Sequence, residues 1–76
     1  MMTHWKTLFE DEIGMRHIRA ERSEDATLRV SAPVAGTALE VEIVAETLGQ
    51  LKQRLIEDGE FTEDQADEIT NRIMFH

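Results

Sequence analysis

Two stretches in the middle of the chain alternate strictly between apolar and polar side chains, and this pattern restricts the chain to folds that contain a sheet. In residues 26–32, and again in residues 39–45, every second residue is apolar. A period of two is typical of a β-strand that buries one face. Pro33 and Gly36 interrupt the alternation, because proline cannot donate a ladder hydrogen bond and glycine favours turns. We therefore predict two strands whose apolar face is covered by a second layer.

The first quarter of the chain carries two different patterns. Residues 15–22 alternate with only a weakly apolar face, which predicts an edge strand. The same arginine-rich stretch also permits a longer first helix, which would leave a sheet of two strands. Before it, Thr3 is a suitable helix cap and Gly14 a suitable helix stop. A short helix between them is predicted by apolar residues with helical spacing, namely Trp5, Leu8, Phe9 and Ile13.

Two further helices are predicted after the last strand. The first is capped by Thr47 and ended by Gly59. The second begins with a capping box, in which Thr62 and Gln65 satisfy each other's free amides, and Phe61 precedes it as a hydrophobic staple. The expected buried stripes are Leu48, Leu51, Leu55 and Ile56 in the first helix, and Ala66, Ile69, Ile73 and Met74 in the second.

Together these elements predict a small α+β domain of two layers. The expected order is a helix, a three-stranded antiparallel meander and a two-helix hairpin, or αβββαα. A chain of 76 residues can bury one core, so residues 1–76 are expected to form a single domain. The chain has no cysteine, so it has neither a disulfide nor a thiolate metal site and relies on packing or on association with a second copy.

Residue types that carry out covalent chemistry are few and scattered. The two serines lie outside any nucleophile motif, and the glycines are too far apart for a phosphate-binding loop. His4, His17 and His76 are dispersed along the chain, and solvated histidines are the ordinary case. The acidic segment 58–69 fails as a calcium loop because Glu63 stands where a glycine is required. We therefore expect no enzymatic activity, no catalytic residue, no metal site and no cofactor.

Charge is distributed unevenly along a chain whose net charge is −8. Residues 31–76 hold ten acidic residues against three basic ones. An acidic surface repels nucleic acid and anionic membranes and attracts basic partners. In the last predicted helix, Asp67 and Glu68 each follow another acid by four residues. Such like-charge pairs are destabilising, so their presence indicates either a use or a need for solubility.

We therefore predict a small acidic protein that binds and regulates or inhibits a basic protein or complex. Carboxylates about 5–6 Å apart on a helix approximate the spacing of backbone phosphates, so the expected partner handles nucleic acid and is reached by mimicry. In size and charge the chain resembles small acidic inhibitors of nucleic-acid machinery, including phage anti-CRISPR proteins, and this resemblance implies an anti-defence role. The residues predicted to contact the partner are Glu57, Glu60, Asp64, Asp67 and Glu68.

A self-associating structural or assembly adaptor is the alternative function. Such a protein would form a homodimer through an apolar surface, and this chain has no disulfide to stabilise a lone small domain. The residues that would form the surface are Trp5, Phe9, Met74 and Phe75.

The uncovered face of the predicted sheet is a second possible docking surface. Glu40 and Glu42 are expected there, but cross-strand pairing with Arg29, and with Arg19, is the favoured explanation for them. No stretch of the chain approaches the roughly 20 apolar residues that span a bilayer, and the first residues lack the apolar region of a secretion signal. We expect a cytoplasmic protein without a membrane partner and without direct binding to nucleic acid.

Overall fold

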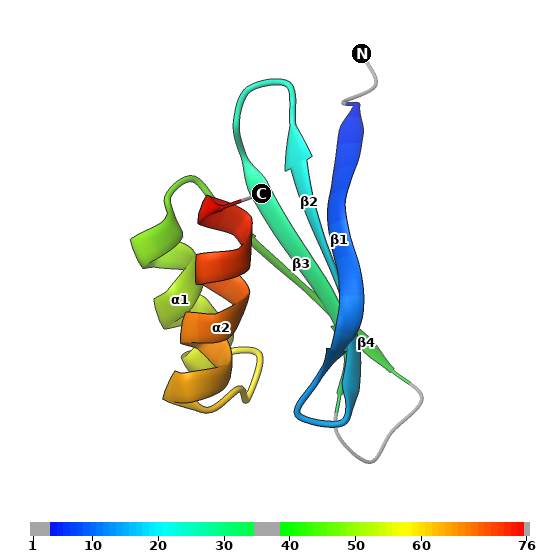
Figure 1. The fold of residues 1–76 in the computed structure, drawn as a ribbon, viewed down its shortest axis with the longest axis vertical. Helices are drawn as coiled ribbons and strands as arrows, with labels where there is room; N and C mark the ends of the chain where they lie inside the picture. Colours follow the sequence, from blue (N-terminus) through cyan, green and yellow to red (C-terminus); the bar gives the residue numbers. More distant parts are fainter. Residues whose placement is uncertain (1–3, 35–38, 76) are drawn as a thin grey trace.

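The computed structural model describes residues 4–34 and 39–75. In this part of the chain, four antiparallel strands form one sheet in the order β1-β2-β3-β4, and two helices follow. Figure 1 shows both helices packed against one face of the sheet, while the opposite face stays open. The elements are β1 (Trp5–Ile13), β2 (Arg16–Ser23), β3 (Leu28–Pro33), β4 (Glu40–Ala45), α1 (Leu48–Glu57) and α2 (Glu63–Met74).

The first element is a strand, so the predicted order αβββαα is wrong. The chain forms four strands and then two helices, and β1 pairs with β2 from end to end. The alternative of a longer first helix is wrong for the same reason. The predicted α+β class is confirmed, and the proposed helix cap Thr3 lies outside the described residues.

A β-bulge in β1 explains why its sequence pattern imitates a helix. The register shifts between Thr7, which pairs with Glu21, and Phe9, which pairs with Ala20, so that Leu8 is an extra residue in β1. In a bulge, two residues of one strand face a single residue of its neighbour. Leu8 belongs to the buried core and Phe9 packs against it, and Ile13 is buried further along the strand. Apolar residues therefore recur at the spacing of a helical stripe although the backbone is extended.

A turn of two residues joins β1 to β2. Ile13 and Arg16 are paired, and Gly14 and Met15 between them have φ values of +62° and +64°. Positive φ at both positions is what a type I′ turn requires. Gly14 also touches α2, because a Cβ at this position would lie 2.0 Å from Nε2 of Gln65. The glycine therefore serves the hairpin and its contact with α2, and does not end a helix.

The other three strands agree with the sequence prediction, and their register aligns the apolar side chains. Ala20 on β2 opposes Val30 on β3, which in turn opposes Ile43 on β4. This row faces the helices and forms the floor of the core. The largest fully buried side chains come from both layers and are Ile18, Val30, Leu51, Leu55, Ile69 and Ile73.

Both predicted carboxyl-terminal helices are confirmed together with their caps. The amide of Gln50 donates a hydrogen bond of 3.1 Å to the hydroxyl of Thr47 at the start of α1. Thr62 and Gln65 form the predicted capping box of α2, with hydrogen bonds of 3.0 and 3.2 Å. In the part of the chain that the structure describes, neither helix is long and apolar enough to cross a membrane.

The connection after α1 differs from the prediction in the role of its glycine. The positive φ falls on Glu60 (φ 59°), whereas Gly59 allows a close approach to the sheet: a Cβ there would lie 2.6 Å from Cδ1 of Ile43.

Two helix residues are less buried than predicted. Ile56 and Met74 were expected to be buried, but they are 38% and 55% exposed. Only the innermost side of each helix meets the sheet, so residues at the margin of an apolar stripe stay in solvent.

One buried cation connects three parts of the fold. Arg16 is 9% exposed, and its guanidinium donates to the carbonyl oxygens of Pro33 at 3.0 Å and Gly59 at 2.7 Å. The same group lies 4.0 Å from the centre of the Phe61 ring. Burial lowers the pKa of Arg16, and nearby Glu60 acts in the opposite direction. The guanidinium stays protonated, and it joins β2, the end of β3 and the connection between the helices.

A second contact fastens α2 to β1. Nη1 of Arg72 lies 2.9 Å from Oδ2 of Asp11, and the guanidinium lies 4.3 Å from the centre of the Phe9 ring. The amide of Glu12 donates to Oδ1 of Asp11 at 2.7 Å. The pKa of Asp11 is lowered, first by this amide and then by Arg72. The carboxylate form of Asp11 is therefore the one that the fold stabilises.

Replacing Arg16 with Met should lower the free energy of unfolding by about 2–4 kcal/mol, because hydrogen bonds from a charged donor are lost and two carbonyl oxygens are left without it. Urea unfolding, followed by the fluorescence of Trp5, measures this value. Arg19→Met on the exposed sheet face is the matched control and should cost much less, because an ion pair in solvent contributes little. Equal losses in the two variants would contradict the role assigned to Arg16.

Acid should weaken the contact between Asp11 and Arg72. Because the pKa of Asp11 is lower in the folded state, its carboxylate contributes stability above the unfolded pKa of about 4, and that contribution is lost as the pH falls through the folded value. Asp11→Asn should therefore be less stable than the native protein at pH 6 and should differ from it less at pH 3. Urea midpoints at both pH values test this, with Glu12→Gln as the control. A difference of the same size at both pH values would refute the prediction.

Candidate functional site

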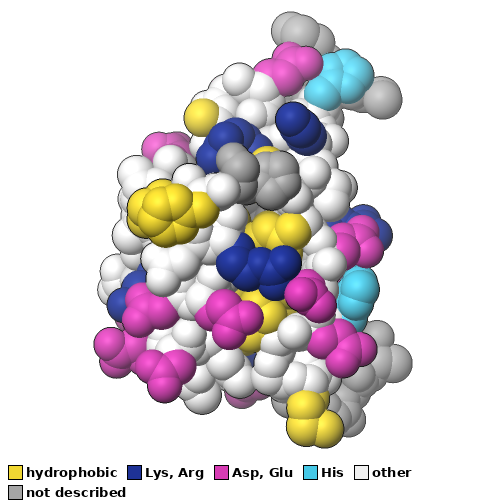
Figure 2. Space-filling view, viewed as in Figure 1, with side chains coloured by type: hydrophobic (Ala, Val, Ile, Leu, Met, Phe, Trp, Pro, Cys, Tyr) yellow, Lys and Arg dark blue, Asp and Glu magenta, His cyan; other side chains and the backbone are white. Residues whose placement is uncertain are grey.

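The helical hairpin, made of α1, α2 and their connection, carries most of the net negative charge together with the residues that flank it. Residues 46–75 include eight acidic residues and three basic ones. Figure 2 shows a group of acidic side chains over the lower half of the hairpin, where α2 begins in Figure 1, and others over the strands beside it. The acidity of the sequence is therefore concentrated at one end of the helical layer.

All three basic residues of the hairpin have partners within the molecule. Nζ of Lys52 lies 2.7 Å from Oδ1 of Asp67, which links α1 to α2. Arg54 donates a hydrogen bond to the carbonyl oxygen of Val44 at the end of the sheet. Arg72 binds β1, as described above. Among the described ion pairs, Asp67 is the one hairpin acid that has a cation.

The five residues predicted to contact a partner fall at this end of the hairpin. The end of α1, the connection and the first two turns of α2 supply them, in the order Glu57, Glu60, Asp64, Asp67 and Glu68. Asp67 differs from the others, because it is half-buried and already paired with Lys52. The other four are exposed and have no ion pair in the described part of the chain. We call these four residues, Glu57, Glu60, Asp64 and Glu68, the acidic end.

Two like-charge pairs in α2 have different surroundings. Asp67 binds Lys52, whose pKa is raised chiefly by this hydrogen bond and to a smaller extent by the charge of Glu63. Asp64 and Glu68 have no such cation among the described residues. Asp64 lies in the first turn, where the helix dipole favours an acid, but Glu68 lies beyond it. Of the four acids in these two pairs, Glu68 is therefore the one whose charge is balanced neither by a described cation nor by the helix dipole.

The role of Lys52 could not be found from the sequence. Lys52 and Asp67 come from different helices, and their contact depends on how α1 and α2 pack. The sequence shows the spacing of the acids within α2, but it does not show which residues of α1 lie next to them.

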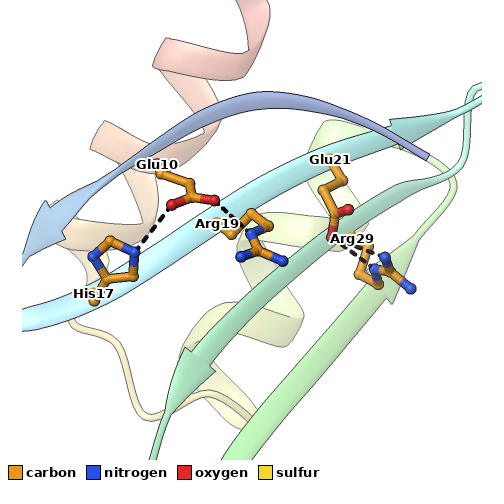
Figure 3. Close-up of polar contacts among 5 residues, drawn as sticks. All are labelled: Glu10, His17, Arg19, Glu21 and Arg29. Atoms are coloured by element: carbon orange, nitrogen blue, oxygen red, sulfur yellow. Dashed lines mark hydrogen bonds and ion pairs between the residues drawn. The ribbon is translucent and has the colours of Figure 1, made fainter.

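The open face of the sheet carries charged side chains that compensate one another. Figure 3 shows Glu10 between two partners, with Nε of Arg19 at 2.7 Å and Nε2 of His17 at 3.3 Å. Beside them, Glu21 lies 2.9 Å from Nη2 of Arg29. The hydrogen bond from Arg19, followed by that from His17, lowers the pKa of Glu10. These contacts link β1, β2 and β3.

Arg29 extends this network across the sheet. Nη1 lies 3.5 Å from Oε2 of Glu42 on β4, and the guanidinium lies 4.1 Å from the centre of the Trp5 ring. The expected pairing of Glu42 with Arg29 is therefore present. Arg19 was also expected to pair with an acid of β4. It binds Glu10 instead, on β1, which was predicted to be a helix. The charges of this face thus have a structural role, which weakens its claim as a docking surface.

The four apolar residues suggested for self-association differ in their exposure and in their contacts. Trp5 lies under Arg29 of the open sheet face, whereas Phe9 packs against the core on the helical side. Met74 and Phe75 are exposed by 55% and 83% at the end of α2. The structure therefore separates the four residues into different surroundings.

Among the described residues, no three His, Asp or Glu side chains are grouped as metal ligands. His4 and His17 are both exposed, and His76 lies outside the described residues.

The chain can also be compared with known proteins. Comparisons with family models, with curated proteins and with solved structures find no match. The function is therefore argued from the contacts and charges of the chain itself.

Proposed function

We propose that this protein is a non-enzymatic interaction protein that uses the acidic end to bind a basic partner and to regulate or inhibit it. One observation carries the proposal: the three basic residues of the hairpin are bound to Asp67, to the carbonyl oxygen of Val44 and to Asp11, while Asp64 and Glu68 have no cation in the described part of the chain. A partner with Lys or Arg side chains at the matching positions would supply the missing charges.

The spacing of the acidic residues favours a partner that normally binds nucleic acid. Asp64 and Glu68 are one helical turn apart, and side chains so placed are about 5–6 Å from each other. Backbone phosphates repeat on a similar scale, so an acidic helix can occupy a phosphate-binding groove. Such a mimic inhibits by occupancy and needs neither catalysis nor a cofactor.

The same charge determines what the protein avoids. With a net charge of −8 it is repelled by nucleic acid and by anionic membranes, so we propose direct binding to neither. A cytoplasmic location belongs to this proposal, because machinery that handles nucleic acid is found there.

The proposed contact should depend on Asp64 and Glu68 and on ionic strength. Affinity capture from the native source, followed by titration of the captured protein, provides the measurement. The double variant Asp64→Asn/Glu68→Gln should bind at least about tenfold more weakly, and native binding should weaken as salt is raised.

A matched variant separates a local contact from general acidity. Glu12→Gln/Glu46→Gln makes the same change in net charge at two exposed positions outside the acidic end. This control should bind within about twofold of the native protein. If both double variants bound equally well, or if affinity were independent of salt, the proposal would be wrong.

Glu68 should also show a trade between stability and binding. Glu68→Gln removes repulsion from Asp64 and should raise the free energy of unfolding by a few tenths of a kcal/mol, while it weakens partner binding. Asp67→Asn breaks the contact with Lys52 and should lower that free energy by up to about 1 kcal/mol. Urea unfolding of both variants gives the signs. A loss of stability in Glu68→Gln would show that Glu68 has a structural role instead.

A further inference from the structure

A concave site lies at the opposite end of the molecule from the acidic end. Its volume is about 370 Å³, and its walls come from the start of β1 and the end of β2. The residues that matter for its chemistry are His4, Trp5, Lys6, Leu8, Arg22 and Glu24. In Figure 1 this end of the β1–β2 pair projects beyond the end of α2.

The helical layer stops short of this site. Arg72, near the end of α2, contacts Phe9 and Asp11, which lie in the middle and later part of β1. The cavity begins on the amino-terminal side of these contacts, where Leu8 contributes an apolar wall at the edge of the core. The site thus combines an apolar wall with charged residues on a rigid strand pair.

Two cations that line this cavity have no side-chain partner among the described residues, whereas the other Lys and Arg residues do. The chain has eight Lys and Arg residues in total. Six of them bind carboxylates or backbone carbonyl oxygens, namely Arg16, Arg19, Arg29, Lys52, Arg54 and Arg72. The remaining two, Lys6 and Arg22, have no ion pair or hydrogen bond from their side chains in the described structure. Both line the cavity.

The register places these two cations directly opposite each other. Lys6 on β1 pairs with Arg22 on β2, and both are exposed. Like charges at directly opposed positions destabilise a sheet. The arrangement occurs in a chain that has twice as many acidic as basic residues, 16 against eight. An anion held between Lys6 and Arg22 would relieve the repulsion.

We propose that this cavity binds a small phosphorylated molecule that also has an apolar part. Arginine offers a fork of N–H donors to a phosphate and lysine a compact charge, while Leu8 offers an apolar wall to the rest of the ligand. The volume falls within the range of small-molecule sites. A long polyanion would extend over the acidic surface and be repelled by it. The net charge of −8 therefore disfavours a long polyanion more than a small phosphorylated molecule.

Glu24 gives the site an internal control. Its carboxylate lines the same cavity and forms no ion pair with Lys6 or Arg22. A negative charge at this position opposes the binding of an anion, so its removal should strengthen binding. If only the net charge of the protein mattered, removing an acid far from the cavity would strengthen anion binding by the same amount.

Trp5 is the sole tryptophan and lines the cavity, so its fluorescence reports occupancy. The full chain is titrated with phenyl phosphate, with inorganic phosphate and with phenol. Phenyl phosphate should give a saturable change, together with shifts of the backbone amide signals of Lys6 and Arg22 in NMR spectra. Inorganic phosphate should bind at the same amides but more weakly, and phenol should not bind. The absence of saturable binding by phenyl phosphate, or equal binding by phenol, would overturn the proposal.

Variants assign the binding to the cavity. Lys6→Gln and Arg22→Gln should each weaken phenyl phosphate binding at least about tenfold, whereas Glu24→Gln should strengthen it. Arg19→Gln removes one positive charge on the open sheet face and should leave affinity within about twofold. Circular dichroism confirms that each variant is folded. If Arg19→Gln weakened binding as much as Arg22→Gln, the effect would come from net charge and the proposed site would be rejected.

Discussion

The arrangement of the two layers depends on the buried guanidinium of Arg16. Fifteen of the described residues form the buried apolar core, and a domain of this size has little burial to spare. Hydrophobic contact is not directional, so it does not by itself fix how the helical hairpin sits on the sheet. Arg16 provides direction, because it binds the carbonyl oxygens of Pro33 and Gly59 at the same time and stacks on Phe61. The missing side chain at Gly59 lets the connection come close to Ile43 and the sheet.

The distribution of charge follows from the scarcity of bases in this chain. Six of the eight Lys and Arg residues are engaged in holding strands, helices and loops together. Too few remain to neutralise the acids. In the part of the chain that the structure describes, Asp64 and Glu68 have no cation at one end, while Lys6 and Arg22 face each other at the other. The two proposals concern these opposite ends and opposite signs of charge. Each can fail without the other.

Sequence reasoning succeeded where the signal is local and failed where it depends on pairing. The alternation of apolar and polar residues in 39–45 and the capping box at Thr62 involve neighbours in the chain. The predicted strand and the predicted capping box are both present in the structure. β1 was missed because the bulge at Leu8 is defined by the opposing strand, which the sequence does not display. The same limit applies to the candidate site: the acids of α2 were identified, but the neutralisation of Asp67 by Lys52 depends on packing between helices.

The bulge in β1 has a consequence for how the protein behaves at high concentration. β1 is nine residues long and forms one border of the sheet, so its outer backbone groups offer a template on which another chain could add a strand. An added strand needs an uninterrupted ladder, and the irregularity between Thr7 and Phe9 breaks that ladder near its centre. In a copy added antiparallel about Asp11, the acids Glu10, Asp11 and Glu12 would meet the same three acids. The bulge and these acids therefore disfavour the addition of a strand at this border.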